Sequence, residues 1–144
     1  MNGVLGGLVG ITAGADLMLP GSSILIGLIS GPIVFLSSSL LEKAKLDDPV
    51  GAIPVHLFCG IWGTLAVGIF GSMASFDQFM IQFACVGITG AFCIVAGTII
   101  VQLVKAVKGL RVSEEAEEVG LDISEHDGSL AYAQFQITSK KYHK

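Results

Sequence analysis

The stretch DDPVGAIPVHLFCGIWGT, from Asp47 to Thr64, opens on two carboxylates and a proline and then stays apolar to about Met73. His56 lies inside that apolar segment. Lipid makes an ionisable side chain costly, so a histidine within a membrane-spanning helix is by default a candidate functional residue. The segment therefore predicts both a helix that crosses a membrane and the position on it where chemistry takes place.

The composition around this stretch is that of a membrane protein. The chain has 144 residues, of which 52% are hydrophobic and 14% are charged, whereas soluble domains are about 25% charged. Before residue 105 the charged residues fall between or near the ends of apolar segments, and the rest crowd into the last forty residues. We therefore predict a transmembrane region over 1–104 and a polar tail over 105–144.

Four apolar segments predict an all-α, polytopic membrane helical bundle. We place the spans at about 3–19, 23–41, 50–73 and 79–104, since about 20 apolar residues are needed to cross a bilayer core of about 30 Å. A span that begins as early as residue 3 leads us to expect further sequence before it, so that this chain is a fragment.

Local signals refine the third span and its packing. Asp48 is expected to cap its helix, with Pro49 at the first helical position, where a missing N–H costs nothing. Gly60, Thr64 and Gly68 repeat at four-residue spacing, which is typical of a face where another helix approaches closely. Three further signals predict short helices in the tail: Ser113 as a cap, Gly120 as an end and Ser124 as a second cap.

Basic residues orient the bundle. Lys43 and Lys45 follow the second apolar segment, and the other basic residues near the spans, Lys105, Lys108 and Arg111, follow the fourth. The positive-inside rule places both groups in the cytoplasm. We therefore predict a multi-pass protein of the plasma membrane with a cytoplasmic C-terminus.

Several classes of function find no support. Glycine-rich phosphate loops and common hydrolase motifs are absent, so we expect no enzyme. No basic patch with interleaved aromatics points to nucleic acid. Cys59, Cys85 and Cys93 lack metal-type spacing and are expected to be small buried hydrophobes, with no metal or cofactor.

Three parts of the chain resemble the Amt branch of the Amt/Mep/Rh ammonium transporters. The stretch from Asp47 to Thr64 is similar to their tenth helix, NGVLGGLVGITAG (residues 2–14) to the start of their eighth, and the tail up to about residue 132, including His126, to their cytoplasmic C-terminus. The order is also the same. The chain thus resembles the last four helices of an eleven-helix transporter.

This resemblance implies a function and a site. It implies transmembrane transport of ammonium or ammonia, with His56 as the second of two pore histidines that handle substrate and proton. A neutral imidazole in a low-dielectric pore can both donate and accept a hydrogen bond. Asp47 and Asp48 match acidic positions at the cytoplasmic end of the helix, with a capping role. The family further implies a homotrimer and contact between the tail and a PII-type signal protein.

Other readings stay open at this stage. The helices resembling one to seven, and the partner histidine with them, are absent from the chain, so it cannot form the family's pore alone. It is either part of a longer or split transporter, a regulatory ammonium sensor acting through its tail, or a non-functional truncated remnant. The species transported, ammonia or ammonium, is also left open.

Overall fold

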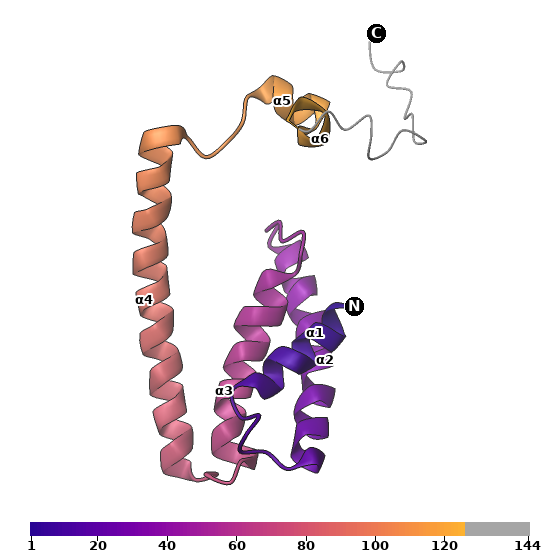
Figure 1. Ribbon diagram of the computed structural model, residues 1–144, viewed down its shortest axis with the longest axis vertical. Helices are drawn as coiled ribbons and strands as arrows, with labels where there is room; N and C mark the ends of the chain where they lie inside the picture. The colour runs from indigo at the N-terminus through magenta and orange to yellow at the C-terminus, as the bar shows by residue number, and fades with distance from the viewer. Residues whose placement is uncertain (126–144) are drawn as a thin grey trace. The chain divides into compact units, whose positions relative to one another are not determined.

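The computed structural model describes residues 1–125, apart from the side chain of Asp122, and these residues confirm an all-α membrane-type fold. The predicted tail extends to residue 144, and its residues from His126 onward lie outside the described residues. The helices (Figure 1) are α1 Asn2–Thr12, α2 Pro20–Lys43, the π-helix η1 Ile53–Phe58, α3 Cys59–Phe70, α4 Phe76–Lys108, α5 Glu114–Val119 and α6 Leu121–Ser124. The chain divides into two units, 1–94 and 95–144, each described by itself.

The first helix is shorter than predicted. A helix was expected across residues 3–19, but α1 ends at Thr12, whose hydroxyl donates to the Leu8 carbonyl at 2.8 Å. Turns follow, with the N–H of Leu17 bonded to the Gly14 carbonyl at 3.0 Å. Glycine and aspartate favour such turns. The high hydropathy of the whole segment nevertheless predicted one continuous helix. With 11 residues, α1 is about 16 Å long, roughly half of a bilayer core.

Three other helical segments are long and apolar enough to cross a membrane: Pro20–Lys43, Ile53–Phe70 and Phe76–Lys108. They correspond to the predicted spans 23–41, 50–73 and 79–104. Proline begins the first of them at a position where its missing N–H is harmless. Its second proline, Pro32, lies inside the helix, which continues to Lys43.

Helix α2 buries one narrow stripe of small and medium side chains, formed by Ile26, Ser30, Val34 and Ser37. Their spacing of three to four residues keeps them on one face. Both serines satisfy their hydroxyls within the helix: Ser30 Oγ donates to the Ile26 carbonyl at 2.8 Å and Ser37 Oγ to the Ile33 carbonyl at 2.6 Å. The stripe therefore has no large side chain and no unpaired serine hydroxyl, so another helix can lie close against it.

Helix α1 fills that position because two of its glycines are buried. A Cβ on Gly6 would lie 2.5 Å from Val34 Cγ2 and 3.1 Å from Cys59 Sγ, and one on Gly10 would meet Ser30 Oγ. On α3, a Cβ on Gly63 would lie 2.8 Å from the Gly10 carbonyl carbon. The backbones of α1 and α3 thus touch at Gly10 and Gly63.

Within this chain, the face predicted on the third span makes a close contact at only part of its length. A Cβ on Gly60 would meet nothing within 4 Å, so the close approach is made by Gly63 instead. Gly68 does sit at a close contact, because its Cβ would lie 2.5 Å from Phe79 Cα at the start of α4. The four-residue spacing thus included Gly68, whereas the contact with α1 is made by Gly63, which lies outside that pattern.

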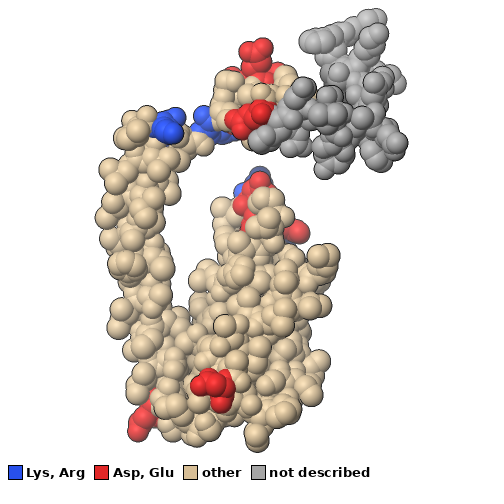
Figure 2. All heavy atoms as spheres, in the orientation of Figure 1, with Lys and Arg blue, Asp and Glu red and all other residues tan. Residues whose placement is uncertain are grey.

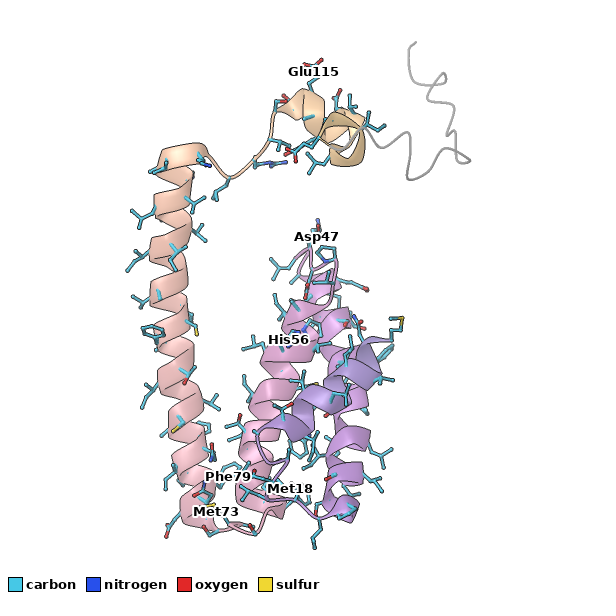
Figure 3. All side chains as sticks on the ribbon, in the orientation of Figure 1. Met18, Asp47, His56, Met73, Phe79 and Glu115 are labelled. Carbon is cyan, nitrogen blue, oxygen red and sulfur yellow. The ribbon has the colours of Figure 1, made fainter. Side chains whose placement is uncertain are left out.

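The connections at one end of unit 1–94 are tied together. The N–H of Ser72 donates to the Leu17 carbonyl at 3.0 Å, which joins the α1–α2 and α3–α4 connections. Met18, Met73 and Phe79 mark this end in Figure 3. At the opposite end, the Asn2 side chain donates to the Val50 carbonyl at 3.5 Å. Helix α1 is therefore fastened at both ends to the chain that surrounds α3.

Apolar surface dominates the outside. Helix α4 has 33 residues and buries none of them, so Cys85 and Cys93 are exposed rather than buried as expected; Cys59 is buried. Figure 2 shows charged atoms of unit 1–94 gathered at its two ends, with an uncharged band between them. An apolar band of this kind is what a hydrocarbon environment requires.

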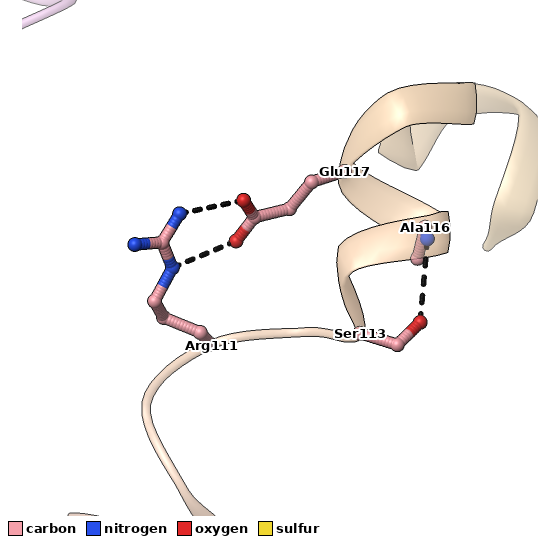
Figure 4. A network of polar contacts seen from close by, with 4 residues as sticks. All are labelled: Arg111, Ser113, Ala116 and Glu117. Atoms are coloured by element: carbon pink, nitrogen blue, oxygen red, sulfur yellow. Dashed lines mark hydrogen bonds and ion pairs between the residues drawn. The ribbon is translucent and has the colours of Figure 1, made fainter.

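The tail contains the predicted first helix. Ser113 caps α5 by accepting the Ala116 N–H at 3.2 Å, and Gly120, at φ 94°, ends it. Arg111 donates twice to the Glu117 carboxylate, at 2.8 and 2.6 Å (Figure 4), and these bonds lower the pKa of Glu117. Their contribution is present at neutral pH and is lost as pH falls through that lowered pKa. Ser124 is not a cap as predicted, because it is the last residue of α6.

The Gly10–Gly63 contact can be tested by adding one methyl group. We expect Gly63→Ala to destabilise the chain in detergent micelles by about 1–3 kcal/mol, because the new Cβ meets backbone that no rotamer change can move. Gly60→Ala, on the same helix, has open space and should be neutral or gain up to about 1 kcal/mol from helix propensity. Equal unfolding temperatures for the two variants would contradict this packing.

Candidate functional site

His56 is carried by η1, the π-helix that leads into α3 (Figure 3). Its side chain is exposed, as is Ala52 in the turn before it, and the position next to Gly60 in the turn after it is open. Its neighbour Val55 is buried. Within residues 1–125 no protein group hydrogen-bonds the imidazole. Both ring nitrogens are therefore accessible on the outward side of this helix.

Asp48 holds the start of this helix from outside it. Its Oδ1 accepts the N–H of Ala52 at 2.9 Å, and its Oδ2 accepts that of Ile53 at 2.8 Å. The helix begins four residues later than predicted, so Pro54 rather than Pro49 occupies its first turn. The extra residues form a turn closed by Gly51, at φ 72°, whose N–H donates to the Asp48 carbonyl at 3.1 Å.

Every N–H at this helix start is accounted for. Asp48 takes two of them, Pro54 has none, and Val55 donates to the Gly51 carbonyl at 3.1 Å. Helix starts normally leave several N–H groups in need of partners, and in an apolar environment each unpaired one is costly. The carboxylate of Asp48 therefore allows this helix to begin without exposing backbone donors.

Asp47 makes a different contribution. Its side chain is exposed and lines an open depression of about 320 Å³ at the end of unit 1–94 where α2 meets the loop before η1. The lining residues are Asn2, Ser38, Leu41, Glu42, Leu46, Asp47, Asp48, Pro49, Gly51 and Pro54. His56 is not among them, so the structure brings Asp47 and Asp48 together but does not join His56 to the same cavity.

Two features of the site were missed by the sequence reasoning. The first is the π-helix, for which the second proline of the stretch, Pro54, is the only visible signal. The second is the contact of Trp62, whose Nε1 donates to the Ile26 carbonyl at 3.2 Å. A tryptophan in an apolar helix usually needs a partner for this N–H, but sequence cannot tell which carbonyl supplies it. Together these features fix how the helix bearing His56 lies against α2.

The arrangement can bind a small polar solute beside one imidazole. An accessible neutral histidine accepts a hydrogen bond at one nitrogen and donates one at the other, and it can carry a proton between them. Glycine and alanine one turn away leave space next to the ring. In the described residues no three His, Cys, Asp or Glu side chains gather as a metal site would require.

Comparison with known proteins shows which family the chain belongs to. Residues 1–132 match the Ammonium Transporter Family. Among curated relatives, the ammonium transporter Amt2 of Methanocaldococcus jannaschii is 41% identical over 87% of this chain, and Amt2 of Archaeoglobus fulgidus is 38% identical over 95%. These alignments cover 31% and 33% of the relatives, so the chain spans about a third of their length. The chain belongs to the ammonium transporter family.

Proposed function

We propose that this chain supplies the C-terminal part of a pore that transports ammonium or ammonia across a membrane, with His56 as the residue that handles the substrate and its proton. The observation that carries the proposal is the position of His56: an accessible imidazole on an otherwise uncharged, apolar helix, in a chain that belongs to a transporter family. Lipid disfavours such a side chain unless it faces other protein or a water-filled path.

The chemistry follows from the imidazole itself. A nitrogen bearing a lone pair accepts an N–H of ammonium, and a protonated nitrogen donates to the lone pair of ammonia. In this proposal ammonium passes its proton to the lone-pair nitrogen of the imidazole on entry, ammonia crosses the apolar segment uncharged, and the imidazolium releases the proton on the far side. No Asp, Glu, Lys or Arg lies on the helical segment 53–70 that carries His56.

Asp48 and Asp47 have supporting roles in this proposal. Asp48 pairs with the backbone at the helix start, so its carboxylate is already occupied by two N–H donors. Asp47 is exposed in the depression beside it, at the end of the helix that the positive-inside rule assigns to the cytoplasm. We therefore assign Asp48 to holding the pore helix and Asp47 to the loop at its mouth.

The assembly and the location are also part of the proposal. By resemblance, three complete protomers associate in the plasma membrane, each with its own pore, and the tail faces the cytoplasm. Apolar side chains of the tail, Leu110, Val112, Val119 and Leu121, are exposed in this chain. They supply a surface for docking on the transporter's cytoplasmic face or for a PII-type signal protein.

Orientation can be tested with single cysteines. The protein is a chimera in which this chain replaces the aligned segment of A. fulgidus Amt2, with the native cysteines changed to alanine. Cysteines are then introduced one at a time at four exposed positions: Ala15, Ala44, Ala74 and Glu118. We expect a membrane-impermeant thiol reagent to label intact cells at positions 15 and 74 only, because the basic clusters hold the other two inside. Labelling at position 44 would show that the predicted orientation is wrong.

The role of His56 is tested in the same chimera. His56→Ala should lower ammonium flux about tenfold or more, or change selectivity for ammonium over potassium, while the amount of protein in the membrane stays near that of the parent. Leu57→Ala is the matched control, since Leu57 is the next residue and is also exposed.

A packing role for His56 predicts the reverse: less assembled protein, with normal flux in each surviving molecule. Currents and surface protein are therefore measured together. If the alanine variant keeps both the flux and the selectivity of the parent, the proposed role of His56 is wrong.

Tail docking is tested by hydrogen exchange. In the assembled chimera we expect slow exchange of the amides of Val119 and Leu121, although their side chains are exposed in the isolated chain. Val119→Asp should restore fast exchange, because a charge opposes burial of that surface. Glu118→Asp, one residue earlier and already charged, is the control. Fast exchange in the unmodified chimera would show that the tail does not dock.

A further inference from the structure

The π-helix coincides with the candidate functional residue. Among the described helices η1 is the only π segment, and its six residues, IPVHLF, contain His56. In a π-helix each N–H bonds to a carbonyl five residues back, and such turns are rare and often occur at functional sites. The rest of this spanning segment, α3, is a regular α-helix. The departure from α geometry is therefore local to His56.

Packing explains why residues 53–58 form a π turn rather than an α turn. Pro54 and Cys59 are both almost fully buried, each under 2% exposed, although they lie five residues apart. In an α-helix, residues five apart point about 140° from each other around the axis. A π turn brings them to nearly the same side. The three residues between Val55 and Cys59, namely His56, Leu57 and Phe58, are all exposed.

Both ends of the π turn are anchored. At the far end, Cys59 Sγ donates to the Ser30 carbonyl at 3.6 Å and the residue packs with Val34 and Val55. At the near end, Pro54 has no N–H, and the carbonyl four residues before it, that of Val50, accepts from Asn2 at 3.5 Å. A proline ring would clash with a carbonyl directed toward it from that position. Here that carbonyl is occupied elsewhere.

From this geometry we infer that Pro54 is a positioning residue for His56: buried against the bundle, it keeps the π turn that sets the direction in which the imidazole projects. The inference rests on the function proposed for His56. Alanine at position 54 removes the buried ring, and with it the packing that keeps residues 54 and 59 on the same side of the helix. Because one residue corresponds to about 100° of α-helix rotation, rewinding moves the imidazole by a large fraction of a turn.

The test uses Pro54→Ala in the chimera with A. fulgidus Amt2. We expect selectivity for ammonium over potassium to change about tenfold or more, since small misplacements of a reacting group have effects of this size. Pro32→Ala is the matched control, because it makes the same substitution inside α2, at an exposed residue. Selectivity is measured per molecule, with surface protein determined in parallel.

A double variant separates positioning from general stability. If Pro54 acts through His56, Pro54→Ala has no further effect on selectivity once His56→Ala is present. A merely structural role predicts less folded protein in both backgrounds and unchanged selectivity in the surviving molecules. Unchanged selectivity after Pro54→Ala, or an equal change in both backgrounds, overturns the inference.

A second variant covers the case in which Pro54→Ala does not fold. Deletion of Leu57 leaves Pro54 and Cys59 four residues apart, which is the spacing that keeps both buried in an α-helix. It should change selectivity in the same direction, and normal selectivity would overturn the inference. If His56→Ala itself has no effect on flux or selectivity, the proposed function fails; if only the Pro54 and Leu57 variants lack an effect, the positioning role alone fails.

Discussion

The contact between the backbones of Gly10 and Gly63 is the constraint on which the rest of this bundle depends. It lets the short helix α1 lie against both α2 and α3 without a side chain between them. Once α1 is there, its first residues reach the loop before η1, where Asn2 meets the Val50 carbonyl. Asp48 then closes the helix start. The contact made by two glycines thus helps to position the loop and the helix start that precede His56.

Polar groups inside the bundle follow the rule for an apolar solvent. Within the described residues every buried side-chain nitrogen or oxygen has a hydrogen-bonding partner. The buried serines return their hydroxyls to carbonyls of their own helix, and Trp62 uses the same Ile26 carbonyl as Ser30. Two helices are thereby joined without any charged group. His56 differs from these groups, because it is ionisable and exposed and has no hydrogen-bonding partner in the described residues.

Hydropathy was enough to predict three helical segments that are long and apolar enough to cross a membrane, because length and apolar composition alone decide this. It could not predict the end of α1 at Thr12, since the apolar segment continues past the turns with a single charge, Asp16, inside it. Asp48 was expected at the start of a helix, but the turn at Gly51 delays that start, and only a positive φ reveals it. The π turn depends on which residues are buried five apart. No local pattern carries that information.

The central claim is that the imidazole of His56 lines a narrow path for substrate, and a cryo-electron-microscopy structure of the chimera with A. fulgidus Amt2 tests it most directly. The account predicts His56 facing a narrow passage, with a histidine of the other half of the transporter beside it and the π turn at 53–58 intact. A His56 ring pointing into lipid, or sealed in a dry contact between two helices, would contradict the account.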